Sequence, residues 1–331
     1  MLLEPIPETV LDVRNLNVRF STPDGDVHAV SDVSFSLGKG ECLGIVGESG
    51  SGKSQTFLAA LGLLAENGLT SGQVILDGSD MLAISEEKLT AIRGNKISMV
   101  FQDPMTSLTP HMRIGRQLTE VLTQHLNVSE AEARDRALTM LKRVHMPEPE
   151  KRFSMYPHEL SGGMRQRVMI AMALLCSPEV VIADEPTTAL DVTVQAQILD
   201  LIRDIKESAR KSIVLITHDL GVVAGLADRV AVMYAGRIVE EGRTQDIFYR
   251  PTHPYTRGLL ACMPRLNDDG AQPLTTIPGQ PPDLQKLPPG CVFRARCANA
   301  FERCISENPK LTPAAHGGRK ACFLASEAVN P

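Results

Sequence analysis

The stretch Gly47-Glu-Ser-Gly-Ser-Gly-Lys53-Ser54 follows the continuously apolar segment Cys42-Leu-Gly-Ile-Val46 and precedes a helical pattern from Gln55 to Leu64. It fits G-x-x-x-x-G-K-[S/T] in full, and a buried strand before it and a helix after it are the context that this pattern requires. Glycines allow backbone N–H groups to converge on phosphate oxygens, and the helix N-terminus adds partial positive charge. The stretch therefore predicts a phosphate-binding loop (P-loop) in an α/β protein.

The side chains of this P-loop fit the chemistry of ATP with magnesium. Lys53 supplies a point charge for the β- and γ-phosphates, and the Ser54 hydroxyl is a ligand for Mg²⁺. A Gly/Ser-rich turn without a ligand is the alternative, which the complete motif in its strand–loop–helix context disfavours. We expect ATP to be bound by the whole loop: Gly47, Glu48, Ser49, Gly50, Ser51, Gly52, Lys53 and Ser54.

Two acidic residues end a second apolar strand, Val180-Val-Ile-Ala-Asp184-Glu185. An acid at the C-terminal end of a buried strand lies beside the P-loop in sheets of this kind, where Asp184 can hold Mg²⁺ or its water shell. Glu185 is then placed to orient and deprotonate the attacking water. Alone, such an acid is more often a solvated turn residue, but together with the P-loop the catalytic interpretation is favoured.

A second possible phosphate-binding helix terminus lies at Leu160-Ser161-Gly162-Gly163-Met164, before a helix predicted from Arg165 to Leu175. Ser161 is expected to cap this helix, and the two glycines expose further N–H groups at its positive end. By itself, this pattern is common and mostly structural. The chain nevertheless carries it in addition to a complete P-loop.

The remaining pattern divides the chain into a core, an insertion and an extension. Residues 11 to 45 alternate as β-strands, residues 111 to 176 are mostly helical, and strand–helix alternation resumes from Val180 to Thr217. Prolines after about residue 245 break any long element. We expect an α/β ATPase domain over residues 1–250, with an antiparallel β subdomain and a helical subdomain at about 104–176. A small extension with four cysteines would occupy residues 251–331.

The order and spacing of these motifs resemble those of the ABC ATPase family over residues 10 to 245. The resemblance implies a head-to-tail dimer, in which the signature glycines of one subunit close over the γ-phosphate on the P-loop of the other. The terminus at Ser161, Gly162 and Gly163 would therefore serve the partner's nucleotide. Six motifs carry the resemblance: the P-loop, Gln102, Leu160-Ser-Gly-Gly163, Asp184-Glu185, Ala189-Leu-Asp191 and His218.

The same resemblance implies further site residues. His218 would hydrogen-bond the γ-phosphate and position Glu185, and Gln102 would meet magnesium and water as a third catalytic residue. Asp191 would contact the opposing subunit. Phe20 resembles the aromatic residue that stacks on adenine, with a place in the hydrophobic core as the alternative. The expected magnesium ligands are Ser54, Gln102 and Asp184.

Longer stretches narrow the resemblance to the ATPase subunits of bacterial oligopeptide and dipeptide importers, and the segment from Phe20 to Asp26 and the tail favour the oligopeptide type. The implied assembly has a second, different ATPase subunit, two transmembrane permease subunits and an extracytoplasmic peptide-binding protein. The chain would lie on the cytoplasmic face of the cell (inner) membrane as a peripheral protein. The stretches are residues 101–108, 156–172, 183–197 and 253–255.

Four of the seven cysteines are crowded near the end of the chain, at Cys291, Cys297, Cys304 and Cys322. In a reducing compartment this indicates a metal before a disulfide, and four thiolates suffice for zinc or a [4Fe–4S] cluster. No C-x2-C pair is present, which disfavours a zinc ribbon, and free thiols are a further alternative. Similar tails in peptide-importer ATPases are associated with a [4Fe–4S] cluster, which the resemblance therefore favours. Four arginines would offset its negative charge: Arg294, Arg296, Arg303 and Arg319.

Composition limits the partners and the place of the 331-residue chain. With 34 Lys and Arg against 39 Asp and Glu, the net charge is −5, so no bulk basic field favours nucleic acid as a partner. The longest apolar run, Val168 to Cys176, is shorter than the roughly 20 residues that span a bilayer. The start of the sequence lacks the pattern of a signal peptide. We expect membrane association to come through partners.

Three other functions are compatible with parts of the sequence. A soluble ABC ATPase acting on DNA or the ribosome is one, but such proteins usually carry tandem cassettes, coiled-coil insertions or basic arms. A transporter of dipeptides, nickel or glutathione is the second, because substrate choice lies in other subunits. A redox-sensing interaction protein is the third, although an intact Glu185 favours ATP turnover.

Overall fold

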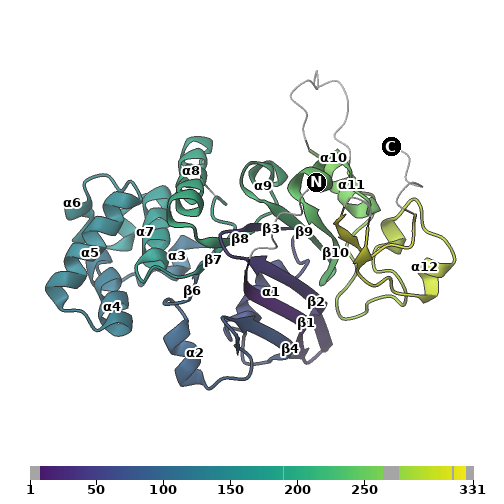
Figure 1. Ribbon diagram of the computed structural model, residues 1–331, viewed down its shortest axis with the longest axis horizontal. Coiled ribbons are helices and arrows are strands. Elements are labelled where there is room, and N and C mark those ends of the chain that lie inside the picture. Colours follow the sequence, from purple (N-terminus) through teal and green to yellow (C-terminus); the bar gives the residue numbers. More distant parts are fainter. Residues whose placement is uncertain (1–7, 189, 264–275, 315–316, 326–331) are drawn as a thin grey trace. The chain divides into compact units, whose positions relative to one another are not determined.

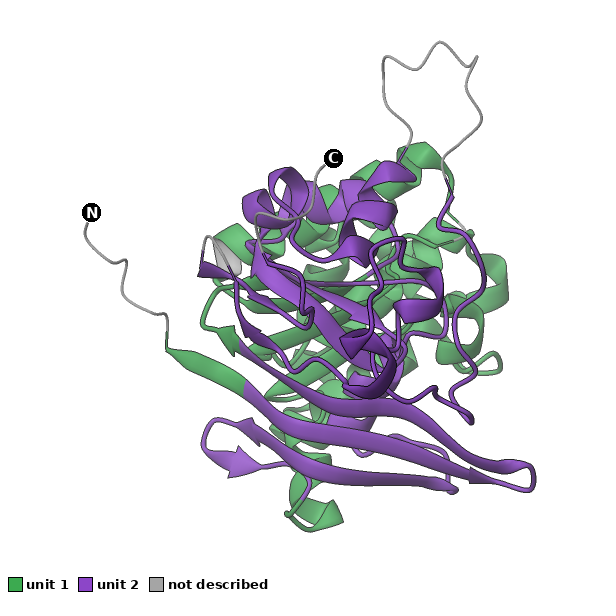
Figure 2. Ribbon diagram, turned by 90° about the vertical axis from the view of Figure 1, so that its right-hand side faces the viewer, with its two compact units in different colours: residues 1–11, 37–42, 83–216 green, residues 12–36, 43–82, 217–331 purple. Residues whose placement is uncertain are grey.

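The computed structural model of the chain describes residues 8–188, 190–263, 276–314 and 317–325 (Figure 1). The chain forms two compact units (Figure 2). Unit 1 comprises residues 1–11, 37–42 and 83–216, and unit 2 comprises residues 12–36, 43–82 and 217–331. The P-loop therefore belongs to unit 2, together with the whole described extension, and the predicted helical subdomain belongs to unit 1.

A four-stranded sheet with the strand order β2-β1-β4-β5 is built largely from unit 2. Apolar residues at alternate positions bury one face of its strands, as Val33, Phe35 and Leu37 do in β2. Asn15, at a φ of 48°, shifts the alternation along β1 by one residue. The strands are β1 (Thr9–Thr22), β2 (Gly25–Gly38), β4 (Gly68–Leu76) and β5 (Ser79–Asp80).

A second set of strands in unit 2 leads into the P-loop. β3 (Cys42–Val46) is buried throughout and pairs in parallel with β9 (Arg229–Tyr234), which pairs antiparallel with β10 (Arg237–Arg243). The extension then adds β12 (Arg319–Lys320) to β10, and β11 (Thr312–Pro313) to β12. The helices of this unit are α1 (Lys53–Ala60), α9 (Leu220–Leu226), α10 (Thr244–Tyr249), α11 (Pro254–Ala261), η2 (Arg294–Arg296) and α12 (Arg303–Ser306).

Two buried carboxylates on β10 hold the following segments to this sheet. Glu240 accepts hydrogen bonds from the backbone N–H and the hydroxyl of Thr252, both at 2.6 Å. Glu241 pairs with Arg229 on the neighbouring strand at 2.5 Å and with Arg319 of the extension. Buried charges are tolerated only when they are paired or hydrogen-bonded, so both acids depend on these partners.

The strands of unit 1 form a parallel set with β7 in the middle. β7 (Val180–Asp184) pairs with β6 (Ile97–Val100) on one side and with β8 (Ser212–Ile216) on the other. Every residue of β7 and β8 is buried, which is typical of parallel strands covered on both faces. The described part of the unit also contains α2 (Glu86–Ile92) before the insertion, α3 (Pro104–Ser107) at its start and α8 (Val192–Ala209) after it.

The helical insertion packs amphipathic helices on one another. Leu118 and Leu122 of α4 and Leu141 of α5 are fully buried, and Ser129 caps α5 because its hydroxyl accepts from the N–H of Glu132. The predicted α/β fold with a β subdomain and a helical insertion is confirmed. Among the described residues, no helix combines the length and the apolarity needed to cross a membrane. The insertion contains α4 (Ile114–Leu126), α5 (Glu130–Arg143), α6 (Pro149–Phe153), η1 (Pro157–Glu159) and α7 (Gly162–Leu174).

Some predicted boundaries differ from the structure. The helix after the P-loop was predicted to reach Leu64, but α1 ends at Ala60 because Gly62 adopts a φ of 63°. The signature helix begins at Gly162 instead of Arg165, since Ser161 caps it three residues earlier. The division into domains at residue 250 stays a prediction, and the two compact units do not follow that border.

Replacing Gly115 of α4 with alanine should destabilise unit 1, because an added Cβ would lie 2.1 Å from Cε1 of the buried Phe153. Overpacking of this kind lowers the free energy of unfolding by about 1–3 kcal/mol. Thermal unfolding would report the loss, and Phe153→Leu should recover part of it. The control is Gly225→Ala in α9, where nothing lies within 4 Å of an added Cβ. Equal unfolding midpoints for the two alanine variants would contradict the close packing.

Candidate functional site

The P-loop connects β3 to α1 within unit 2 and lies against backbone from two other segments. A Cβ on Gly47 would lie 2.2 Å from the carbonyl oxygen of Met233 at the end of β9. A Cβ on Gly52, whose φ is 96°, would lie 2.3 Å from the carbonyl oxygen of Ala29 in β2. Only glycine fits at either position, so the fold of the loop itself requires both glycines, besides the predicted phosphate binding.

The interior of the loop presents polar groups suited to phosphate. Lys53 is 6% exposed, and its ammonium donates to the carbonyl oxygens of Gly47 at 2.8 Å and Glu48 at 3.0 Å. The buried hydroxyl of Ser51 has no hydrogen-bond partner among the described residues. A buried hydroxyl without a partner costs free energy, and a ligand oxygen would relieve that cost. These groups fit the predicted phosphate site.

Glu48 of the loop is held by residues from far along the chain. Its backbone N–H donates to the hydroxyl of Tyr255 at 3.0 Å, and its carboxylate accepts two hydrogen bonds from Arg296, at 2.7 and 3.0 Å. The hydrogen bonds that Arg296 donates to Glu48 raise the pKa of Arg296, and burial raises the pKa of Tyr255. All three residues belong to unit 2.

Two other predicted ATP-binding residues belong to unit 2. Phe20 lies near the end of β1 with a partly exposed ring, whose Cε1 would be 3.0 Å from a Cβ on Gly68. His218 is exposed and follows Thr217, whose N–H donates to the carbonyl oxygen of Ile45 at 3.1 Å. That hydrogen bond ties the segment before His218 to the strand that leads into the P-loop.

In unit 1, Asp184 and Glu185 end β7 as the sequence predicted. Asp184 is 4% exposed. Glu185 has a φ of 46°, a left-handed conformation that costs a non-glycine residue about 1–3 kcal/mol. Its N–H donates to the carbonyl oxygen of Ile216 at 2.8 Å, and its carboxylate accepts from the hydroxyl of Thr188 at 2.7 Å. Nine other non-glycine residues among those described also have a positive φ, so this conformation positions Glu185 but does not by itself mark it as catalytic.

The signature segment begins α7 in unit 1. Ser161 accepts a hydrogen bond from the N–H of Met164 at 3.4 Å, so it caps the helix as predicted, and Gly162 is exposed. Gly163 lies so close to α8 that an added Cβ would be 2.5 Å from Cγ1 of Val194. Gly163 therefore has a packing role besides the predicted phosphate-binding role.

The remaining predicted residues of unit 1 lie at element ends. Asp191 caps α8, because its carboxylate accepts from the N–H of Val194 at 3.0 Å, and this cap was not predicted. Gln102 is exposed in the segment between β6 and α3. Ala189, which belongs to the predicted motif of Asp191, lies outside the described residues.

The two units thus divide the predicted ATP residues into two sets. Unit 2 holds Phe20, the P-loop and His218, which are the groups expected to bind the nucleotide. Unit 1 holds the acids expected to act on magnesium and water, together with the groups expected to face a partner. The members of the second set are Gln102, Ser161, Gly162, Gly163, Asp184, Glu185 and Asp191.

The extension gathers its four cysteines around one small pocket in unit 2. The pocket, of about 10 Å³, is lined by Cys291, Cys297, Cys304 and Cys322 together with apolar neighbours such as Phe293. All four are free thiols in the structure. The described residues contain no group of three or more His, Cys, Asp or Glu side chains that could hold a metal ion.

Burial and backbone amides set the protonation of these thiols. Burial raises the pKa of Cys291 to about 11, and it also raises the pKa of Cys297 and of Cys322. Each of these sulfurs receives an opposing hydrogen bond from the backbone two residues further on, at Phe293, Asn299 and Leu324 respectively. The repeated arrangement turns three N–H groups toward three sulfurs.

The four arginines predicted to offset the charge of a cluster have other partners. Arg296 binds Glu48, Arg319 binds Glu241, and Arg303 pairs with Glu307 at 2.9 Å. Only Arg294 lines the cysteine pocket, and its guanidinium also donates to the carbonyl oxygen of Ile305 at 2.6 Å. Nearby acids bind Arg296, Arg303 and Arg319, so compensation of a cluster's charge by all four arginines stays a prediction.

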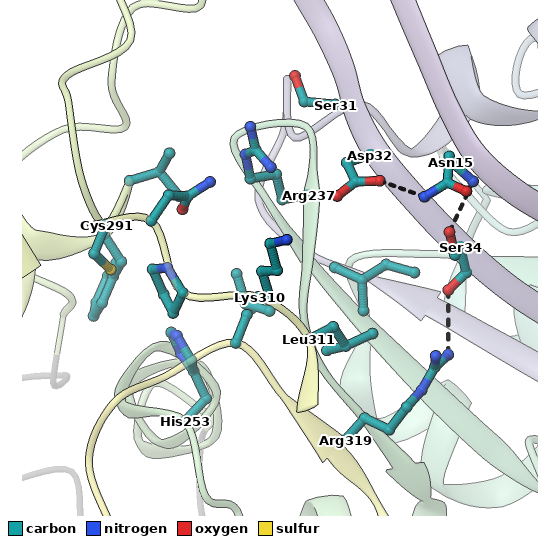
Figure 3. A pocket seen from close by; sticks show the side chains of 17 residues that line it. Asn15, Ser31, Asp32, Ser34, Arg237, His253, Cys291, Lys310, Leu311 and Arg319 are labelled. Atoms are coloured by element: carbon teal, nitrogen blue, oxygen red, sulfur yellow. Dashed lines mark hydrogen bonds between the residues drawn. The ribbon is translucent and has the colours of Figure 1, made fainter. Parts of the chain in front are cut away.

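A larger pocket, of about 470 Å³, lies between the extension and the strands β1 and β2 of unit 2 (Figure 3). Figure 3 shows His253 and Cys291 on one side of it and Asn15, Asp32 and Ser34 on the other. Cys291 also lines the small cysteine pocket, so this residue borders both pockets. Nothing in the predicted ATP chemistry uses this space.

Comparison with known proteins places these features in a family. Residues 30–188 match the ABC transporter family, and residues 239–304 match the family described as the C-terminal region of oligopeptide/dipeptide transporters. Over 98% of its length, the chain is 57% identical to an oligopeptide transport ATP-binding protein of Salmonella typhimurium, and it covers 96% of that protein. The chain belongs to the ABC transporter ATPase family.

Other relatives of this ABC transporter ATPase support the same family assignment. A dipeptide transport ATP-binding protein of Bacillus subtilis is 51% identical over 97% of the chain and 96% of its own length. A solved dimeric ATP-binding cassette, in a post-hydrolysis state bound to ADP and Pi, matches 71% of the chain and 98% of its own length, with 30% identity and a TM-score of 0.64. A cassette from Clostridium perfringens matches 73% of the chain and 91% of its own length, with 29% identity and a TM-score of 0.61.

Sequence reasoning about this ABC transporter ATPase missed Tyr255 and Arg296 as neighbours of the P-loop. Tyr255 was noticed only as part of His253-Pro-Tyr255, and Arg296 only as a positive charge beside a cysteine. The two residues lie 207 and 248 positions away from Glu48, so no local pattern connects them with it. The sequence offers one signal: Tyr255 is an aromatic residue in a proline-rich boundary region, and an aromatic side chain there indicates packing against another part of the chain.

Gly163→Ala should lower both the unfolding midpoint and the ATP turnover of this ABC transporter ATPase, because its Cβ would collide with Val194. Adding Val194→Ala removes the collision and should restore the midpoint. If Gly163 also has to approach a phosphate closely, turnover of the double variant stays low, and we expect this result. Full recovery of turnover would show that Gly163 is needed only for packing.

Proposed function

We propose that the chain is the ATP-hydrolysing subunit of an ABC transporter that imports oligopeptides. The observation that carries the proposal is the 57% identity, over 98% of the chain, to an oligopeptide transport ATP-binding protein. A complete P-loop and the acids Asp184 and Glu185 at the end of β7 support ATP turnover by this chain itself. The same role for dipeptides is the second candidate, favoured by the 51% identity to a dipeptide transport ATP-binding protein.

The nucleotide-binding residues would act as follows. Lys53 exchanges its carbonyl partners in the P-loop for oxygens of the β- and γ-phosphates, and backbone N–H groups of the loop bind the remaining oxygens. Phe20 stacks on adenine, which its partly exposed ring allows. His218 hydrogen-bonds the γ-phosphate and positions Glu185.

Hydrolysis itself would rest on Glu185. The oxygen of a water molecule attacks the γ-phosphorus, the bond from that phosphorus to the bridging oxygen of ADP breaks, and Glu185 accepts the proton of the water. Ser54, Gln102 and Asp184 supply oxygen atoms, which are the ligands that magnesium prefers. Magnesium bound there would neutralise charge on the phosphates.

Each chain would provide two halves of different sites. Ser161, Gly162 and Gly163 would close over the γ-phosphate on the P-loop of a second ATPase subunit, and Asp191 would contact that subunit. The exposed start of α7 supports this part, because N–H groups at a free helix terminus attract phosphate. We infer that the partner is a different ATPase subunit, which makes the assembly a heterodimer.

The transport assembly would further contain two transmembrane permease subunits and an extracytoplasmic peptide-binding protein. The chain would lie at the cytoplasmic face of the inner membrane as a peripheral protein. ATP closes the ATPase dimer and hydrolysis reopens it, so nucleotide state shifts the conformation of the permeases. The segment after Gln102, about residues 103–120, would receive a short helix of a permease.

We also propose that the four thiols around the cysteine pocket hold a [4Fe–4S] cluster with a structural or regulatory role. Four cysteine thiolates are the ligand set of such a cluster, and hydrogen bonds to the sulfurs stabilise it, as the three backbone N–H groups at this pocket would. The same four thiolates would hold zinc in the alternative case, and metal analysis distinguishes the two. ATP hydrolysis needs no electron carrier, so electron transfer is not part of the proposal.

Glu185→Gln should lower ATP turnover by at least about 100-fold, because it removes the base that accepts the proton of the attacking water. ATP binding should persist, so a nucleotide-bound dimer accumulates, and peptide uptake by the assembled transporter stops. Phosphate release and size-exclusion chromatography with ATP would measure the two effects. The matched control is Glu179→Gln, because Glu179 is exposed at the other end of β7. Turnover near the parental value in Glu185→Gln would exclude Glu185 as the base.

Anaerobic purification should yield a coloured protein with about four irons per chain if the cysteine pocket holds a [4Fe–4S] cluster. Cys297→Ala should lose the colour and the iron, whereas Cys262→Ala should keep both, because Cys262 does not line the pocket. Metal analysis and a visible spectrum measure the outcome. A colourless protein with one zinc, or with four titratable thiols and no metal, would overturn the cluster.

A further inference from the structure

The guanidinium of Arg296 has a partner for every one of its donors. Two donors bind the carboxylate of Glu48 in a bidentate pair, at 2.7 and 3.0 Å. The others meet the carbonyl oxygens of Pro278 at 3.0 Å and Ile277 at 3.2 Å and the hydroxyl of Tyr234 at 3.5 Å. A guanidinium has five N–H donors in a fixed planar fork, so this set satisfies all of them and fixes its orientation.

Burial strengthens this contact compared with an ion pair at the surface. The side chain of Arg296 is 5% exposed and that of Glu48 is 26% exposed. Surface ion pairs contribute little, but removing one partner of a buried pair leaves a charge without compensation. Glu48 would therefore move if Arg296 were lost, because its carboxylate would have to find water.

A cluster of aromatic rings positions Tyr255, which makes the second contact to Glu48. The hydroxyl of Tyr255 accepts from the N–H of Glu48, and the Tyr255 ring packs at 4.6 Å on Tyr234 and at 5.4 Å on Phe293, measured between centroids. Tyr255 and Tyr234 are almost completely buried. Phe293 also lines the cysteine pocket, and Arg296 directly precedes Cys297. The extension therefore contacts both the backbone N–H and the side-chain carboxylate of Glu48.

Glu48 in turn shapes the inside of the P-loop. Its carbonyl oxygen accepts from the ammonium of Lys53 at 3.0 Å and from the N–H of Ser51 at 3.2 Å. Consequently the N–H, the carbonyl and the carboxylate of Glu48 are all engaged, two of them by the extension and one by the phosphate-binding groups. If Glu48 were displaced, its carbonyl oxygen, which accepts the hydrogen bond from Lys53, would move with it.

We propose that Arg296 and Tyr255 are positioning residues for nucleotide binding, through which the C-terminal extension holds the P-loop in its binding conformation. The inference rests on the proposed binding of ATP by the P-loop, but it does not depend on the transported substrate or on the metal content of the cysteine pocket. A loop that is already ordered binds its ligand more tightly than one that must be ordered on binding. The extension thus contributes to ATP affinity without touching ATP.

The test compares nucleotide affinity with turnover in the full chain assembled with its partner subunits. Arg296→Gln should raise KM for ATP and the Kd for a fluorescent ATP analogue roughly tenfold, since loop ordering then accompanies binding. The kcat should stay within about twofold, because no group that touches the reacting atoms changes. Tyr255→Phe, which keeps the buried ring, should raise both constants by a smaller factor.

Two comparisons separate positioning from a general effect on stability. In Glu48→Gln/Arg296→Gln, the uncompensated carboxylate is gone, so KM should rise less than the product of the two single effects predicts. Arg203→Gln is the control, because Arg203 forms an exposed ion pair with Asp200 at 2.6 Å, and its KM should be unchanged. Unchanged KM and Kd in both Arg296→Gln and Tyr255→Phe, with only a lower unfolding midpoint, would overturn the proposal. If parental protein bound no ATP analogue, the proposed ATP function itself would fail.

Discussion

The close approach of backbone at Gly47 and Gly52 is the constraint on which the rest of the nucleotide-binding unit depends. Carbonyl oxygens of Met233 and Ala29 occupy the space that a Cβ would need, so the loop is enclosed by strands from two different parts of the chain. This enclosure brings Lys53 inward and leaves the Ser51 hydroxyl buried without a hydrogen-bond partner in the part of the chain that the structure describes. The fold of unit 2 consequently forms the proposed phosphate site without any ligand.

The features that could be predicted from sequence are those that depend on a few consecutive residues. The P-loop, the two acids at the end of β7 and the cap at Ser161 each combine a local pattern with a local structure, and all of them occur in the structure as expected. Packing partners such as Phe153 beside Gly115 could not be predicted, because they depend on how helices meet. The roles assigned to Gln102, Asp191, His218 and Phe20 came from resemblance, and they stay predictions.

Long-range contacts of charged residues were the least predictable part. Arg296 and Arg319 looked alike as cations near cysteines, yet each binds a different acid from another part of the chain. The sequence shows that these residues are charged but not which acid each one pairs with, because a salt bridge depends on the distance between the two groups in the folded chain. The same limitation hid the role of Glu240 and Glu241, two acids that β10 buries and that the following segments neutralise or hydrogen-bond.

The proline-rich border near residue 250 invites an experimenter to express a shorter fragment that ends there. In such a fragment Glu240 would lose Thr252, and Glu48 would lose both Arg296 and Tyr255. The face of Tyr234 that Tyr255 and Phe293 cover would be open to water, which favours association of exposed apolar surfaces. A fragment of the cassette alone would therefore be a poor substitute for the whole subunit. Weak nucleotide binding by that fragment would result from the truncation and would not represent the affinity of the full chain.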